Sequence, residues 1–130
     1  SKQDTAERLN HYRPSTLERL NICLQVNVDD SPSKDGFSPE GMMECLATVM
    51  SMDRLRVRGL MCFPDRQPSD SKLNDLFQQT ALLFQKAQAL YPELDTLSMG
   101  TSDSYQDAIR AGSTMVRIGT KVFGERRVQQ

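Results

Sequence analysis

The stretch Leu20-Asn21-Ile22-Cys23-Leu24-Gln25-Val26-Asn27-Val28 alternates strongly and is rich in branched side chains. A period of two places every second side chain on the same face, so we predict a β-strand here. Working outward from this segment, we predict further strands at residues 55–61, 96–99 and 114–118.

Helical patterns separate these predicted strands. Ser38 and Pro39 are suited to the N-cap and the first position of a helix that runs to about residue 52. Apolar residues at three-and-four spacing predict a long helix at residues 71–90, and Gly112 is suited to cap a helix at residues 103–111. A short polar helix at residues 5–12 precedes the first strand. Strands that alternate with helices indicate parallel β/α units, and hence the α/β class.

The length of the chain limits the architecture. With 130 residues the chain is expected to form one domain, residues 1–130. A closed (β/α)8 barrel of the TIM type needs about 250 residues, so four strands make about half of one. The alternative is an open parallel sheet, whose faces and edges would need cover that two short C-terminal helices provide poorly.

Composition and charge exclude several classes of protein. A chain with 38% hydrophobic and 25% charged residues is expected to fold. A net charge of −1 without a basic block argues against nucleic acid as the main partner, and no apolar run approaches the ~20 residues of a membrane span. Three scattered cysteines, Cys23, Cys45 and Cys62, indicate reduced thiols in a cytoplasmic protein, and His11 is the only histidine. We therefore expect no metal site and no catalytic triad.

Two glycine-containing turns follow the last two predicted strands, at residues 98–103 and 117–120. Glycine lets a backbone approach a ligand closely, and amides that open a helix suit an anion such as phosphate. Ser102 and Thr120 add hydroxyl groups. The alternative is that Ser102 or Asp103 only caps a helix and the glycines only turn the chain. No GxxxxGK[ST] motif is present, so a nucleoside triphosphate is not expected.

Several cations also need an interpretation. Arg117 lies within an otherwise apolar strand, where it is either a site residue or part of a salt bridge at the rim. Arg56 and Arg58 share one face of a strand and point either to the barrel lumen or to acids in the missing part of the fold, or else to solvent. Lys34 lies in a polar loop, where lysine is usually solvated.

Long runs of this sequence resemble one known family. The runs at residues 97–105, 108–120 and 122–124, together with residues 24–27, 33–37 and 55–61, closely resemble the pyridoxal-phosphate homeostasis protein family, also called the proline-synthase co-transcribed homologue family. The resemblance extends from about Arg13 to Arg126.

The resemblance implies the C-terminal half of a barrel of the alanine-racemase N-terminal type, binding pyridoxal 5′-phosphate (PLP). It assigns Thr101 and Ser102 to one phosphate-binding turn, and Gly119 and Thr120 to the other. It implies that Arg117 faces the pyridine nitrogen and leaves that nitrogen unprotonated, which weakens the ring as an electron sink.

The family's Schiff-base lysine belongs to an N-terminal stretch that this chain lacks, and none of the five lysines matches its motif. The expected partner, besides PLP, is therefore the missing N-terminal half or a second copy of the chain. The function that this implies is non-catalytic PLP binding and homeostasis.

Two alternative functions stay open at this stage. One is a fragment of a PLP enzyme such as an amino-acid racemase or decarboxylase. Such enzymes carry a C-terminal β domain, for which the residues between Gly124 and Gln130 leave no room, so we expect no enzyme. The other is an unrelated phosphate-binding barrel, which gives no reason for Arg117.

Overall fold

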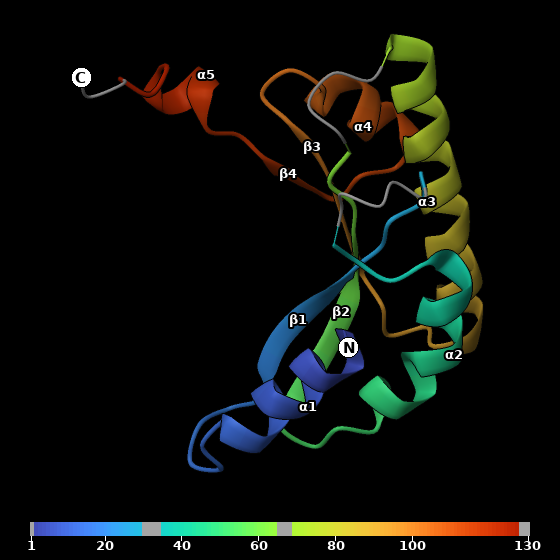
Figure 1. Ribbon diagram of the computed structural model, residues 1–130, viewed down its shortest axis with the longest axis vertical. Coiled ribbons are helices and arrows are strands. Elements are labelled where there is room, and N and C mark those ends of the chain that lie inside the picture. Colours follow the sequence, from blue (N-terminus) through green and yellow to red (C-terminus); the bar gives the residue numbers. More distant parts are fainter. Residues whose placement is uncertain (1, 30–34, 65–68, 128–130) are drawn as a thin grey trace.

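The fold is seen in a computed structural model that describes residues 2–29, 35–64 and 69–127 (Figure 1). In chain order the elements are α1 (Lys2–Tyr12), β1 (Leu20–Gln25), α2 (Pro39–Met50), β2 (Leu55–Met61), α3 (Asp70–Leu90), β3 (Thr96–Thr101), α4 (Tyr105–Ala111), β4 (Met115–Arg117) and α5 (Thr120–Phe123).

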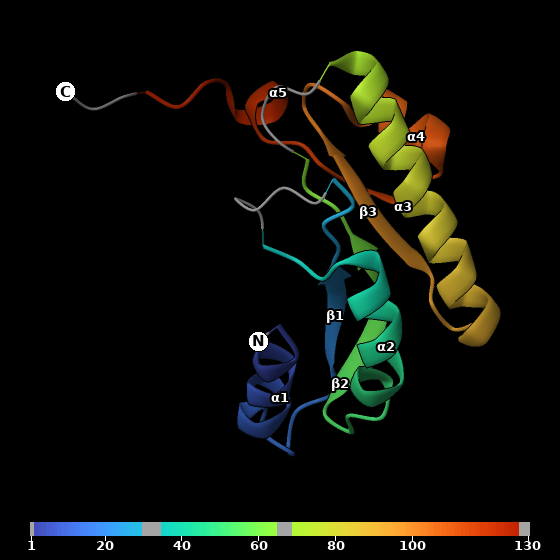
Figure 2. The same cartoon turned by 45° about the vertical axis from the view of Figure 1, so that its right-hand side comes forward.

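The four strands form one sheet in the order β1-β2-β3-β4, and every pair is parallel. Helices α2, α3 and α4 lie on one side of this sheet (Figure 2). Sequential parallel strands with helices on the outer side are the arrangement of part of a β/α barrel. The predicted α/β class and the half-barrel are therefore confirmed.

The core lies between the sheet and the helices on its outer side. Met42 and Leu46 of α2, Phe77 of α3, and Leu97 and Met99 of β3 are all buried members of this one core. The predicted periodicity of α3 holds along most of its length, although Leu90 at its end is 63% exposed. This layer fixes the strands whose carboxyl ends carry the candidate site.

Local capping signals behave as predicted at two helices. The amide of Gly41 donates to the Ser38 hydroxyl at 3.0 Å, with Pro39 at the start of α2. Gly112 follows α4 with φ of 114°, a left-handed conformation that favours glycine.

Several element boundaries differ from the prediction, and two of these differences have a visible cause. Strand β1 ends at Gln25 rather than Val28, and Val26 instead forms an isolated bridge with Phe37. Helix α4 begins at Tyr105 rather than Asp103, because the Ser104 hydroxyl accepts the Thr101 amide at 3.1 Å and extends the turn.

Hydroxyl groups connect the short strand β4 to β3. The Leu97 amide donates to the Thr114 hydroxyl at 2.7 Å, and the Met99 amide donates to the Ser113 hydroxyl at 3.3 Å. The Ser113 hydroxyl in turn lies 2.8 Å from the Met99 carbonyl oxygen. These bonds hold β4 where its register with β3 shifts.

Arg58 finds its partner within this chain. Its guanidinium makes a two-bond ion pair with Asp95, at 3.0 and 2.6 Å, in the segment before β3. Arg56 is exposed. The acid that pairs with Arg58 thus lies within this chain rather than in a missing part of the fold, whereas solvent exposure describes Arg56.

The Arg58–Asp95 pair predicts a pH dependence of stability. The hydrogen bond from Arg58 lowers the pKa of Asp95 from 3.8 to about 2. A carboxyl group with a lowered pKa stabilises the folded state above its unfolded pKa, and this contribution is lost as the pH falls from about 4 to about 2. Because the pair is largely exposed, the effect is expected to be small.

Melting temperatures of the wild type and Asp95→Asn should therefore differ at pH 7 and converge near pH 2. Asp75→Asn, on the exposed side of α3, is the matched control. A difference between wild type and Asp95→Asn that persists unchanged at pH 2 would contradict the assignment.

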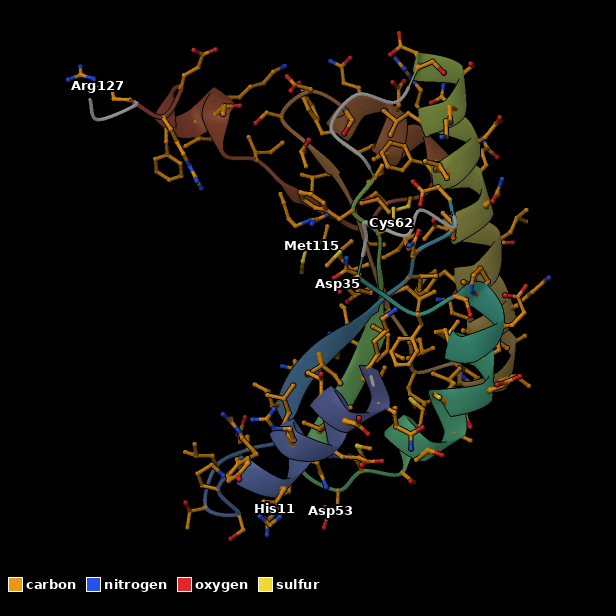
Figure 3. All side chains as sticks on the ribbon, viewed as in Figure 1. His11, Asp35, Asp53, Cys62, Met115 and Arg127 are labelled. Carbon is orange, nitrogen blue, oxygen red and sulfur yellow. The ribbon has the colours of Figure 1, made fainter. Side chains whose placement is uncertain are left out.

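Apolar side chains remain exposed near both edges of the sheet. Near β4 these are Met115 (52% exposed), Val122 (67%) and Phe123 (86%), and near β1 they include Tyr12 (74%) and Leu17 (54%). Figure 3 shows the Met115 side chain on the open side of the sheet, away from the helices. Among the described residues no helix is long and apolar enough to cross a membrane.

Candidate anion-binding site at the ends of β3 and β4

The two predicted turns lie against each other, joined at Ser102. The buried Ser102 hydroxyl accepts the amide of Gly119 at 3.3 Å and the amide of Lys121 at 3.2 Å. Thr101 also pairs with Arg117 across β3 and β4. The structure thus brings the backbones of Thr101, Ser102, Arg117, Gly119 and Thr120 together at the carboxyl end of the sheet.

Ser102 does not cap the helix that follows it. Both of its observed bonds reach the next β/α turn, and the residue at the cap of α4 is Ser104. With its oxygen accepting two N–H groups, the Ser102 hydroxyl is polarised and its own proton is available to a further acceptor. Ser102 therefore does not cap α4, but it accepts amides at the start of α5, so a helix-capping role for Ser102 stays open at that second helix.

Two glycines of the site are used differently. Gly100 has φ of 98°, and a Cβ added there would lie 2.7 Å from the Ala108 Cβ, so the close approach of α4 requires glycine. Gly119 has φ of −117°, and a Cβ there would meet nothing within 4 Å. Neither backbone conformation nor packing within the described chain requires glycine at Gly119, which leaves open space above the second turn.

Arg117 projects from β4 toward the segment that follows β2. Its Nη2 donates to the Cys62 carbonyl oxygen at 2.7 Å, and its guanidinium carbon lies 5.1 Å from the centre of the Phe63 ring. Its Nε is buried and has no hydrogen-bond partner among the described residues. A buried donor without an acceptor is costly, so this N–H is a candidate to bind a ligand.

The electrostatics of Arg117 fit the same interpretation. Burial lowers the pKa of its guanidinium from the ordinary value. Arginine nevertheless stays protonated in proteins, so the group remains a cation and a donor. No carboxylate forms an ion pair with Arg117 in the part of the chain that the structure describes, so the rim salt bridge is not observed there.

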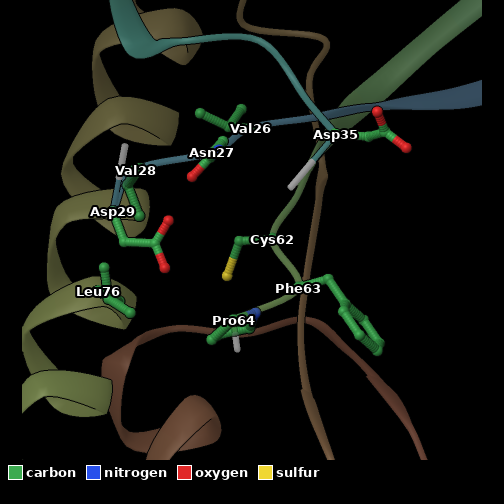
Figure 4. Close-up of a pocket in the computed structure, with 9 residues that line it drawn as sticks. All are labelled: Val26, Asn27, Val28, Asp29, Asp35, Cys62, Phe63, Pro64 and Leu76. Atoms are coloured by element: carbon green, nitrogen blue, oxygen red, sulfur yellow. The ribbon is translucent and has the colours of Figure 1, made fainter. Parts of the chain in front are cut away.

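The pocket at the carboxyl ends of β1 and β2 is too small for a cofactor. Val26, Asp29, Cys62 and Leu76 are among the residues that line it (Figure 4), and it encloses about 10 Å³. That volume holds about one water molecule. The candidate site is therefore the open surface of the two turns.

The other polar residues singled out in the sequence lie elsewhere. His11 is exposed at the end of α1, where its ring meets Tyr12 edge to face. Lys2, Lys72 and Lys86 are exposed on α1 and α3, and Lys34 lies outside the described residues. None of the three cysteines forms a disulfide; Cys62 is buried and the other two are partly buried.

Sequence reasoning missed three residues of this region. The Lys121 ammonium lies 4.9 Å from the centre of the Tyr105 ring, which links α5 to α4. Phe63 contacts Arg117 from a position 54 residues earlier in the chain. An aromatic residue directly after a strand was the available signal for Phe63, but nothing local connects it to Arg117.

Comparison with known families gives a match along nearly the whole chain. Residues 1–127 match the family described as alanine racemase, N-terminal domain. The pyridoxal phosphate homeostasis protein of Escherichia coli (strain K12) is 44% identical over 121 residues, which cover 93% of this chain and 52% of that protein. The chain thus spans about half the length of the curated relatives it matches.

Solved structures agree with the fold. The structure of PipY from Synechococcus elongatus PCC7942, with PLP bound, superposes with a TM-score of 0.83 at 28% identity, covering 93% of this chain and 57% of PipY. Alanine racemase of Clostridium difficile 630, in complex with cycloserine, superposes with a TM-score of 0.67 at 15% identity, covering 96% of this chain and 35% of the racemase. The second likeness shows a shared fold alone.

Proposed function

The chain belongs to the alanine racemase N-terminal domain family, and we propose that it is the phosphate-binding part of a non-catalytic protein that binds PLP and maintains its supply. The observation that carries the proposal is the junction of the two turns at Ser102, beside an arginine whose buried Nε has no acceptor in the described chain. The similarity to pyridoxal phosphate homeostasis proteins and to PLP-bound PipY supports it.

The two turns fit a phosphate group. Thr101 and Ser102 on one side and Thr120 on the other offer hydroxyl groups within a small space, while the amides of Thr101 and Gly119 already donate to the Ser104 and Ser102 hydroxyls. The polarised Ser102 hydroxyl would donate to a phosphate oxygen, and Gly119 would leave room for that oxygen to approach the backbone. The same donors would exclude a cation from this position.

Arg117 fits the pyridine ring. PLP, when bound, supplies an aldehyde that forms imines and a ring that can withdraw electrons. The Arg117 Nε–H would donate a hydrogen bond to the ring nitrogen without transferring its proton, because a guanidinium is far less acidic than a pyridinium. The ring nitrogen would stay unprotonated, and its capacity to stabilise a carbanion would be low, which favours storage over catalysis.

We further propose that residues 1–130 are one partial barrel domain whose open edges, β1 and β4, are covered by strands from outside the chain. These strands would come from an N-terminal half, since the relatives are about twice as long, or from a second copy of the chain. Unpaired strand edges favour such association. The cytoplasm is the proposed location, since free cysteines persist in reducing compartments.

The test is a titration of the purified chain with PLP, followed by fluorescence, with pyridoxal as the control that lacks phosphate. PLP is expected to bind reversibly and at least about tenfold more tightly than pyridoxal, because charge-assisted hydrogen bonds contribute ~1.5–3 kcal/mol each. Equal affinity for the two compounds, or no binding of PLP, would refute the proposal. Inorganic phosphate should compete with PLP.

The same preparation should not racemise alanine or decarboxylate amino acids when supplied with PLP. Lys121, whose amide belongs to the junction, has its ammonium over the Tyr105 ring, 4.9 Å from the ring centre. Turnover that Arg117→Ala abolishes would contradict the non-catalytic assignment.

A further inference from the structure

The position of Arg117 depends on the segment that follows β2. Because β3 lies between β2 and β4 in the sheet, the Arg117 side chain must cross the end of β3 to reach Cys62 and Phe63. The Cys62 carbonyl oxygen accepts a hydrogen bond from Arg117 Nη2 at 2.7 Å, and the centre of the Phe63 ring lies 5.1 Å from the guanidinium carbon. These are the two contacts that fix the guanidinium in the described chain.

Phe63 has little role in the core. Phe63 is 46% exposed, whereas the residue before it, Cys62, is only 2% exposed. Figure 4 shows the Phe63 ring pointing away from the small cavity into which the Cys62 thiol points. The ring thus lies outside the cavity, where it meets the Arg117 guanidinium.

An aromatic ring holds a guanidinium in a way that an aliphatic side chain cannot. The cation is attracted to the negative face of the ring, and this attraction grows as the pair loses water. The flat guanidinium also packs well on an aromatic face, which restricts its rotation. With one terminal nitrogen on the Cys62 carbonyl, the pairing fixes the direction in which the buried Nε–H points.

We propose that Phe63 is a positioning residue for Arg117, which holds the Nε–H in the orientation that recognises an acceptor nitrogen of a heteroaromatic ligand. The inference rests on the proposed function for the identity of the ligand. It adds a residue outside the two turns, and it predicts that the affinity for the ring part of PLP depends on the aromatic character of position 63.

The first test needs no ligand. In proton–nitrogen spectra of the arginine side chains, assigned with Arg117→Lys, the Arg117 Nε–H should be shifted by the ring current and exchange slowly with water. In Phe63→Leu the chemical shift of the Arg117 Nε–H should move toward the values of the exposed arginines, whereas in Phe63→Tyr it should stay unchanged. Because the ring is nearly half exposed, both variants are expected to melt close to the wild type.

The second test measures PLP affinity by the same titration. Phe63→Leu is expected to weaken binding by roughly threefold to thirtyfold, the size of a cation–π attraction at a partly buried site, and Phe63→Tyr should stay within about twofold. In an Arg117→Ala background, Phe63→Leu should have no further effect, because its contribution acts through the arginine.

These outcomes separate the inference from the proposed function. If the wild type fails to bind PLP, the proposed function fails, while the arginine signals still decide whether Phe63 positions Arg117. An unchanged Arg117 signal and unchanged affinity in Phe63→Leu would overturn the inference. A folded Phe63→Tyr variant that loses the shifted Arg117 signal would also overturn the inference. The tyrosine variant therefore keeps the test decisive even if the leucine variant does not fold.

Discussion

Gly59→Ala is expected to prevent the chain from folding stably. Gly59 lies in the middle of β2, opposite Thr96 of β3, and it is buried. A Cβ at this position would lie 1.6 Å from the Thr96 carbonyl oxygen and 2.6 Å from the Thr96 carbonyl carbon. Both contacts are with backbone, so no side-chain rotation can relieve them, and β2 and β3 would have to separate.

The loss of folding free energy in Gly59→Ala is set by the cost of separating β2 from β3. Overpacking in a core costs ~1–3 kcal/mol and more where the backbone must move. Because the Thr96 backbone itself would have to move, the loss is expected to exceed that range and to reach the lower end of a typical net stability of ~5–15 kcal/mol. We therefore expect no cooperative unfolding transition in Gly59→Ala when the chain is heated and followed by circular dichroism.

Gly119→Ala is the matched control, because a Cβ there would meet nothing within 4 Å and the backbone needs no positive φ. This variant should melt like the wild type and yet bind PLP more weakly, since the added methyl group would occupy the open space above the second turn. A folded Gly59→Ala variant with a wild-type melting temperature would show that the β2–β3 contact is not as close as the structure has it.

The sequence predicted those parts of the fold that depend on neighbours along the chain. Alternation marked residues 55–61 as a strand, and the structure gives β2 the same bounds, Leu55–Met61. Ser38 and Gly112 were recognised at helix ends because a cap depends on a few consecutive residues. The sequence also indicated that the two turns would lie together, because glycines and hydroxyls after two adjacent parallel strands meet at one edge of the sheet, and it marked Arg117 separately as a cation in an apolar strand.

Contacts between distant segments could not be read in this way. Gly59 looked like any residue of a strand, although a glycine within a strand pattern is a signal of close backbone approach. The pairing of Arg58 with Asp95 and of Arg117 with Phe63 depends on which strands become neighbours. The acceptor role of Ser102 depends on the path of the chain after β4, which the residues around Ser102 do not specify.

Ser102→Asp is expected to abolish PLP binding while leaving the fold intact. The Ser102 oxygen accepts the amides of Gly119 and Lys121 at 3.3 and 3.2 Å. A carboxylate is an acceptor with more lone pairs than a hydroxyl, so it can retain both bonds and keep the two turns joined. It cannot donate a hydrogen bond to a phosphate oxygen, and it places a negative charge where the phosphate would lie.

The electrostatic cost of that charge decides the outcome. Two like charges about 4 Å apart repel each other by ~4 kcal/mol at the effective dielectric constant of a protein surface, which corresponds to a loss of affinity of nearly a thousandfold. Ser102→Ala removes the hydroxyl without adding charge, so its loss should be nearer tenfold. Gln79→Glu adds the same charge on the exposed side of α3 and should leave the affinity within about twofold.

An anion held between the two turns predicts one order of PLP affinities. Wild type and Gln79→Glu should bind most tightly, Ser102→Ala more weakly, and Ser102→Asp most weakly. Pyridoxal, which carries no phosphate, should bind all four proteins with similar weak affinity, because its contacts are with the ring part of the site. If Ser102→Asp instead weakens PLP and pyridoxal equally, the substitution acts by distorting the turns and the phosphate lies elsewhere. If it binds PLP within about threefold of the wild type while remaining folded, the junction at Ser102 is a structural connection and carries no anion, since a dianion could not tolerate a carboxylate at that distance.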